Sequence, residues 1–159
     1  MSSQKQRGFT LVEIMIVVAI IGLIASIAIS NLLRARLNSA DSAIKKELRT
    51  FSSGNESYRA AQNPAAYAPT IALLTASVPP YLDTTWDSNP RHGFNLTYSV
   101  AAAPASTYSI IAMPTTVGGT ALNTFCVDQT GVVVGSTSDG MANIPTGTAT
   151  GCTGGVAIL

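Results

Sequence analysis

One acidic residue, Glu13, lies inside an otherwise apolar segment near the N-terminus. Two basic residues precede this segment, and residues 14–29 carry no charge. An ionisable side chain in a membrane segment is costly, so its presence indicates a function. If the chain were cut between Gly8 and Phe9, Glu13 of one copy could pair with the new Phe9 amine of a neighbouring copy, which satisfies both charges. The alternative is that Glu13 lies near the membrane surface, where the cost of its charge is small.

Two cysteines, Cys126 and Cys152, lie far from this segment. An even number of cysteines beyond a membrane helix favours a disulfide in an oxidising compartment. Closing a loop of this length would stabilise the fold by roughly 3 kcal/mol. Two free buried thiols are the alternative. A tetrahedral metal site is disfavoured because His92 is the only histidine and no other cysteine is available.

The sequence contains no motif typical of an enzyme. It lacks a phosphate-binding glycine loop, zinc-ligand spacing and a nucleophile elbow. His92 lies beside a proline and is expected to be solvated in a loop. Asp83, Asp87 and Asn89 supply oxygen atoms at short spacing but match no calcium loop. We therefore expect a protein that is not an enzyme and has no cofactor and no metal.

Residues 9–33 are apolar over about the length that a helix needs to cross a bilayer. Lys5 and Arg7 before this run predict a cytoplasmic N-terminus, with the rest of the chain in the periplasm. An ordinary secretory signal is the alternative, but its cleavage site follows a shorter apolar core of about 7–15 residues. A cut after Gly8 would instead precede the apolar run and leave it in the mature protein.

These N-terminal residues resemble the signature of type IV pilins, which the pseudopilins of type II secretion share. The matching residues are Gly8, Phe9, the triplet 10–12 and Glu13, followed by the apolar helix. The resemblance implies cleavage of a leader, residues 1–8, by a prepilin peptidase and methylation of the Phe9 amine. It also implies assembly into a helical filament, with Glu13 governing methylation and subunit docking.

One position departs from the family pattern. Many family members carry a proline near Ser30, and in their filaments the helix loosens between that proline and an upstream glycine. Gly22 matches the glycine, but Ser30 has neither the ring clash nor the missing donor of proline. The sequence therefore leaves open whether the helix loosens in a filament.

Residues 34–62 are predicted to continue the helix as an amphipathic stem. Apolar side chains recur at steps of three, four and seven residues, at Leu37, Ala40, Ile44, Leu48, Phe51 and Tyr58. Pro64 disfavours helix at the residue before it, so we expect the helix to end near Asn63.

Residues 63–93 are predicted to form a long αβ-loop that connects this helix to a sheet. They are rich in proline, alanine, threonine and asparagine, and residues 71–78 read either as a short helix or as part of the loop. Trp86 either anchors the loop to the sheet domain or offers a surface contact to a partner.

From Phe94 the apolar period changes to two, which is typical of half-buried strands. We expect four strands at 94–100, 107–113, 122–127 and 132–134. The predicted fold class is α+β, with a long N-terminal helix packed on a four-stranded antiparallel sheet. The tail from Gly135, the last part of the β-sheet head (residues 94–159), is rich in glycine and threonine without clear periodicity. Such a segment could not hold a fixed shape by apolar burial alone, and a link from Cys152 to Cys126 on the third strand would give it one. A disulfide-closed C-terminal loop is also typical of the family that the N-terminus resembles.

The charges of the chain are segregated. Residues 34–59 contain six basic and three acidic residues, whereas residues 60–159 contain Arg91 and four acids. A positive stem and an acidic head could complement each other between neighbouring copies. The alternative is a solvated helix face and ordinary surface acids. Loss of Lys5 and Arg7 with the leader would leave a mature net charge of −1, which argues against a nucleic-acid partner.

Three functions remain at this stage. The first is a type IV pilin, held in the inner membrane and polymerised through its apolar helix into an extracellular filament. The second is a pseudopilin that builds a periplasmic pseudopilus. The third is a membrane-anchored binding module that never polymerises. For the first two, the expected partners are identical subunits, membrane lipid before assembly, a prepilin peptidase and methyltransferase, and an inner-membrane assembly platform.

Overall fold

The computed structural model describes residues 8–136 and 145–158, which form two units. The N-terminal unit runs to Arg36, and the C-terminal unit is Leu37–Leu159. The first helix, α1 (Leu11–Ala61), contributes to both units. Lys5 and Arg7, on which the predicted orientation in the membrane depends, lie outside the described residues. So does Asp139, one of the acids counted in residues 60–159.

The N-terminal unit consists of the first part of α1, and its large apolar side chains are all exposed. Its most apolar 18-residue window has a mean hydropathy of 2.8, so the helix is long and apolar enough to cross a membrane. The helix continues through Gly22 and Ser30. The Ser30 hydroxyl donates to the carbonyl of Ile27 at 2.9 Å, a local bond that a helix tolerates.

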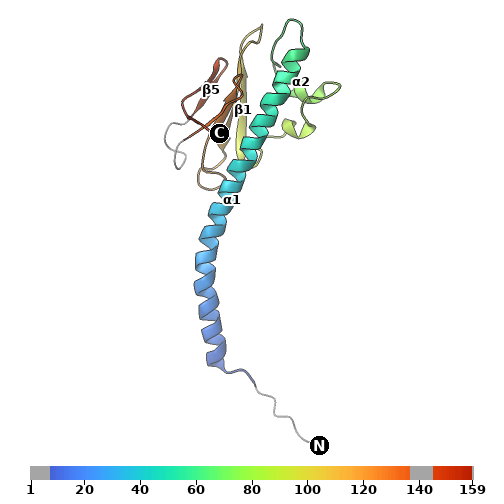
Figure 1. The fold of residues 1–159 in the computed structure, drawn as a ribbon. Coiled ribbons are helices and arrows are strands. Elements are labelled where there is room, and N and C mark those ends of the chain that lie inside the picture. The colour runs from blue at the N-terminus through green and yellow to red at the C-terminus, as the bar shows by residue number, and fades with distance from the viewer. Residues whose placement is uncertain (1–7, 137–144, 159) are drawn as a thin grey trace, which may run out of the picture. The chain divides into compact units, whose positions relative to one another are not determined.

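The C-terminal unit contains the hydrophobic core, and the predicted helical stripe faces it. Leu37, Ile44, Leu48 and Phe51 are buried. Figure 1 shows this part of α1 with the sheet on one side and the loop that carries α2 on the other. The helix ends at Ala61, two residues before the predicted stop, because the chain turns ahead of Pro64.

The sheet has five strands instead of the predicted four. The strands of the unit are β1 (Phe94–Val100), β2 (Tyr108–Pro114), β3 (Phe125–Asp128), β4 (Val133–Gly135), β5 (Thr146–Thr148), β6 (Gly151–Thr153) and β7 (Val156–Ala157). The sheet order is β1-β2-β3-β4-β7, with antiparallel pairing throughout, and β5 and β6 form a separate hairpin. The prediction of four strands was wrong because β7 has only two residues and no apolar period.

The hairpin β5–β6 covers the face of the sheet that does not contact α1. Residues Tyr108–Ala112 of β2 are therefore all buried, where a strand with one solvated face would alternate. The hydroxyl of Ser109 donates to the carbonyl of Thr148 at 2.8 Å across this contact. Gly147 allows the close approach, because a Cβ there would lie 2.8 Å from the Ser109 Oγ.

The αβ-loop contains two short helices, α2 (Ile71–Ala76) and the 3-10 helix η1 (Thr84–Asp87). Trp86 in η1 is buried, and its ring lies 5.2 Å from the ring of Phe51 on α1. The anchoring role proposed for Trp86 is therefore the one that the fold uses.

Strand β1 forms one edge of the sheet, and the loop before it covers part of that edge. The side chain of Asn89 accepts from the Leu96 backbone N–H at 3.0 Å and donates to the Leu96 carbonyl at 2.9 Å. Arg91 and Phe94 exchange a pair of backbone hydrogen bonds just before it. These contacts take the place of a neighbouring strand at the start of β1.

Candidate functional site

The bond between Gly8 and Phe9 lies in exposed, non-helical chain directly before α1. The Phe9 side chain is 85% exposed. Exposed chain outside helices and strands is where proteolytic cleavage concentrates, and the chain meets both conditions here.

Thr10 and Glu13 form a reciprocal cap at the start of α1. The Thr10 Oγ1 accepts from the Glu13 backbone N–H at 3.3 Å, and the Glu13 Oε2 accepts from the Thr10 backbone N–H at 2.8 Å. The Thr10 hydroxyl also donates to Oε2 at 2.8 Å. This is the capping box that a threonine followed three residues later by glutamate specifies. Sequence reasoning missed the cap, although Thr10-Leu11-Val12-Glu13 contains its signature.

The cap uses only one of the two carboxylate oxygens of Glu13. Its Oε1 accepts no hydrogen bond within residues 8–136 and 145–158. The carboxylate can therefore hold the helix start and still offer an acceptor to a second group. The other predicted site residues, Cys126 and Cys152, belong to the C-terminal unit.

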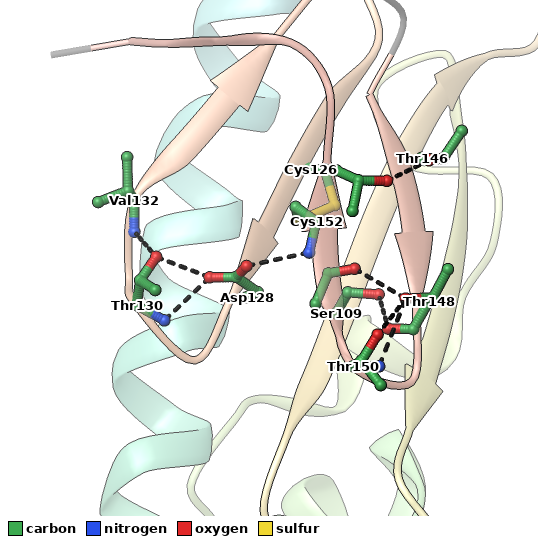
Figure 2. Close-up of a disulfide and its surroundings, with 11 residues drawn as sticks. Ser109, Cys126, Asp128, Thr130, Val132, Thr146, Thr148, Thr150 and Cys152 are labelled. Carbon is green, nitrogen blue, oxygen red and sulfur yellow. Dashed lines mark hydrogen bonds between the residues drawn. A yellow bond between two sulfur atoms is a disulfide. The ribbon is translucent and has the colours of Figure 1, made fainter.

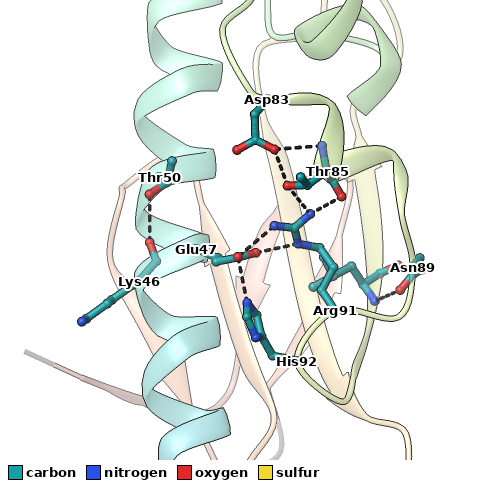
Figure 3. Close-up of polar contacts among 9 residues, drawn as sticks. Lys46, Glu47, Thr50, Asp83, Thr85, Asn89, Arg91 and His92 are labelled. Carbon is teal, nitrogen blue, oxygen red and sulfur yellow. Dashed lines mark hydrogen bonds and ion pairs between the residues drawn. The ribbon is translucent and has the colours of Figure 1, made fainter.

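A polar cluster that the sequence did not predict joins α1 to the loop and to the start of the sheet (Figure 3). Glu47 accepts from Arg91 Nε at 2.6 Å and from Arg91 Nη2 at 2.8 Å. His92 lies in a turn with its side chain 45% exposed, as predicted, but its Nε2 also lies 2.9 Å from Glu47 Oε1, a contact that the sequence did not predict. The Arg91 guanidinium also lies 4.6 Å from the centre of the Trp86 ring.

Glu47 is held as a carboxylate by its partners. Burial raises its pKa, but hydrogen bonds and charge from Arg91 and His92 outweigh burial, so the pKa lies below its usual value of 4.5. The only hint of this cluster in the sequence was that Arg91 is the single arginine or lysine among the acids of residues 60–159. That pattern could not show that this base pairs within the same chain.

The other acids of the amphipathic part of α1 are also used inside the chain. Asp41 is buried and accepts from the Leu122 backbone N–H and from the Asn123 side chain, at 3.3 and 2.7 Å. Glu56 accepts from the Tyr67 hydroxyl. Acids that the sequence pattern left on a solvated helix face therefore connect the helix to the loop and the sheet.

Cys126 and Cys152 form a disulfide, as predicted, which ties β6 to β3 (Figure 2). Asp128, two residues after Cys126, accepts from the Cys152 backbone N–H and from the Thr130 backbone N–H, each at 2.9 Å. Burial raises the pKa of Asp128, but a bond from the Thr130 hydroxyl at 2.7 Å and these two backbone bonds outweigh it and hold the pKa below its usual range. The disulfide and Asp128 together fix β6, the second strand of the glycine- and threonine-rich hairpin.

The described residues hold no group of three or more potential metal ligands. Asp83 and Asp87, considered above as oxygen ligands, instead bond to threonines: Asp83 accepts from Thr85 and caps η1, and Asp87 accepts from Thr75 at 3.1 Å.

A cavity of about 570 Å³ lies beside the C-terminal end of α1. Its lining is mostly alanine and proline, with two tyrosines, Tyr58 and Tyr67, and the amides of Gln62 and Asn63. Burial raises the pKa of Tyr67 to about 12, assisted by its bond to Glu56. The lining therefore suits contact with an apolar surface better than proton transfer at neutral pH.

Comparison with known proteins identifies the same N-terminal signature. Residues 3–29 match the family model described as the prokaryotic N-terminal methylation motif. The type IV wide pilus major component PilA4 of Thermus thermophilus is 32% identical over 109 residues, which cover 69% of this chain and 74% of that protein. No solved structure matches the chain significantly.

Two further relatives match shorter stretches. The type IV major pilin protein PilA of Myxococcus xanthus is 44% identical over 54 residues, which cover 34% of this chain and 24% of that protein. The type II secretion system core protein G of Klebsiella michiganensis is 34% identical over 83 residues, which cover 50% of this chain and 58% of that protein.

Proposed function

The chain belongs to the type IV pilin and pseudopilin family, and from this premise we propose that it is the structural subunit of a type IV pilus. It is inserted in the inner membrane with its N-terminus in the cytoplasm, and it polymerises through the apolar part of α1. A prepilin peptidase removes residues 1–8, and the Phe9 amine is methylated. Its partners are identical subunits, membrane lipid before assembly, the processing enzyme and an inner-membrane assembly platform.

The observation that carries this proposal is the environment of Glu13. It is the only charged side chain in residues 11–33, and its neighbours on α1 are exposed apolar side chains that a membrane or other copies of the helix would cover. In the proposed filament, Glu13 Oε1 receives the Phe9 amine of a neighbouring copy while Oε2 keeps the cap on Thr10. The axial position of each subunit is then set by one charge pair in apolar surroundings.

The processing step is tested by mass spectrometry of the protein from cells with an active peptidase. The proposal expects a mature chain that begins with N-methylated Phe9. A chain that still begins at Met1 in such cells rejects the proposal.

Two substitutions separate the two roles of Glu13. Glu13→Gln keeps an acceptor for the Thr10 N–H but removes the charge, so membrane insertion should persist and filaments should be lost. Thr10→Val removes the hydroxyl of the cap but keeps the carboxylate, so filaments should still form. Electron microscopy of surface filaments and fractionation of membranes give the two readouts. Normal filaments from the Glu13→Gln variant would remove the charge pair from the mechanism.

A pseudopilin of a type II secretion system is the second candidate, and the match to core protein G favours it. The disulfide-closed tail favours the pilin, and a calcium-binding head would favour the pseudopilin. Cells that lack this chain distinguish the two: loss of surface filaments supports the pilin, whereas retained filaments with a defect in protein secretion support the pseudopilin. A membrane-anchored module that does not polymerise would tolerate Glu13→Gln without any phenotype.

A further inference from the structure

The outer face of α1 in the C-terminal unit has an unusual composition for an exposed helix face. It consists of Ser42, Lys46, Arg49, Thr50, Ser53 and Ser57, which lie within one side of the helix and are all exposed. A solvated helix face normally carries many long polar side chains. Here four of the six residues are small, and Lys46 and Arg49 are the only charges.

Three of the four hydroxyls on this face bond back to the helix itself. Ser42 donates to the carbonyl of Asn38 at 2.9 Å, Thr50 to that of Lys46 at 3.1 Å, and Ser57 to that of Ser53 at 2.9 Å. These bonds leave few donors that point outward. Because these side chains are short, the backbone of another segment can approach this face closely. Lys46 and Arg49 can then bind acidic groups of that segment.

Neither cation has an acidic partner in the described part of the chain, although Arg49 Nη2 donates to the Ile158 carbonyl at 3.4 Å. The ion pairs found there involve Arg59, Arg91 and His92 only. The acids of α1 that could have paired with the two cations, Asp41 and Glu47, are bound to the sheet and the loop. Pairing within the chain thus consumes the acids of the helix and leaves Lys46 and Arg49 exposed.

The complementary charge lies on η1. Asp83 and Asp87 are exposed on either side of the buried Trp86. The nearest base, Arg91, already neutralises Glu47. The two acids bond only to threonines and form no ion pair among the described residues, although the charge of Arg91 also acts on Asp83.

We propose that the outer face of α1 in one copy binds η1 of a second copy, with Lys46 and Arg49 opposite Asp83 and Asp87. This inference rests on the proposed function. Two cationic faces repel each other, so the outer face of α1 in one copy contacts η1 of the other. The pair then still exposes one outer face of α1 and one η1. A contact of this kind repeats from copy to copy and gives an open helical assembly.

The test reverses the charges on each side and then on both sides of the full chain in its own cells. Lys46→Glu with Arg49→Glu reverses the helix face. Asp83→Ser with Asp87→Lys reverses η1, and serine at position 83 retains a side chain that can cap η1. The readout is the ratio of this protein in sheared filaments to that in the cell-associated pool. Arg59→Gln, on α1 but off the outer face and beside Glu56, is the matched control.

Each reversal alone should lower the filament ratio by roughly threefold or more, and the four substitutions together should restore it to within about twofold. Arg59→Gln should leave the ratio unchanged. The near-ultraviolet circular dichroism of each purified variant should match that of the unaltered chain, which establishes that each one has folded.

Unchanged filaments in either single reversal overturn this inference and leave the proposed function intact. A loss of filaments that the combined variant does not restore also overturns it, because the cations then serve another anionic surface such as lipid headgroups. Absence of filaments from the unaltered chain would instead reject the proposed function itself.

Discussion

Several buried polar side chains hold the C-terminal unit together by linking α1 to segments that follow it. Asn55 is fully buried; its Oδ1 accepts from the Ala68 backbone N–H at 3.2 Å, and its amide donates to the Tyr98 hydroxyl at 3.3 Å. Asp41 and Glu47 do the same at two other points. These residues replace water as partners for backbone and side-chain polar groups that the fold covers, so removing one leaves its partners unpaired.

Glu47 makes the stability of the unit depend on acid pH. Its pKa is lower in the folded chain than its usual 4.5, so its contribution is present above that value and is lost as the pH falls through the folded pKa. We expect Glu47→Gln to be less stable than the native chain at pH 7 and the difference to shrink below about pH 4.5. Thermal melts by circular dichroism between pH 7 and 3 measure it. A difference that stays constant over this range would show that the carboxylate charge is not the cause.

At the scale of elements, the fit of the αβ-loop against α1 depends on Gly54. A Cβ at this position would lie 2.8 Å from a Leu82 methyl group and 2.9 Å from the backbone oxygen of Tyr81. The glycine is therefore needed for close approach, although by propensity alone a glycine inside a helix is only a weak interruption.

Gly54→Ala should destabilise the unit by about 1–3 kcal/mol, because the backbone of the loop must move. Helix propensity alone predicts the opposite, a gain of about 1 kcal/mol. Gly22→Ala is the control, since no atom outside the helix's own backbone lies within 4 Å of its Cβ position. Denaturant unfolding of both variants in detergent decides between the two effects. Equal or greater stability of Gly54→Ala would rule out the steric account.

The tail hairpin depends on its covalent link. A disulfide that closes 26 residues of chain contributes about 3.5 kcal/mol in the chain-entropy model. Reductant should therefore lower the melting temperature of the native chain. A Cys126→Ser, Cys152→Ser double variant should melt at the lower temperature with or without reductant. A native chain whose melting is insensitive to reductant would show that the link adds nothing to stability.

The elements that the sequence predicted well are those with a long apolar period. The stripe from Leu37 to Phe51 and the alternation from Phe94 to Val100 both reflect burial against the same core. Strands β5 to β7 could not be predicted, because two or three residues of threonine, glycine or valine carry no period. The disulfide and Asp128 hold the β5–β6 hairpin against β3, and β7 pairs with β4. The charge cluster around Glu47 was missed for a related reason, since composition does not reveal which charges meet.

At the scale of the whole molecule, every buried side chain among the described residues belongs to the C-terminal unit. A chain that starts at Leu37 should therefore fold without the apolar segment when it is produced in an oxidising compartment. We expect it to form the disulfide, to remain in solution without detergent and to melt cooperatively. Near-ultraviolet circular dichroism against the full chain in detergent provides the comparison. A broad, non-cooperative melt would show that the apolar segment takes part in folding.

The Asn89 amide that occupies the edge of β1 has a consequence for crowded membranes. An unpaired edge strand can pair with the edge strand of another molecule, which leads to irreversible aggregation when many copies lie side by side. The Asn89 side chain occupies the backbone N–H and C=O of Leu96 at this edge, which hinders pairing with the sheet of another copy. In the proposed pilus subunit, molecules kept at high density in the bilayer would therefore stay available for association through their helices.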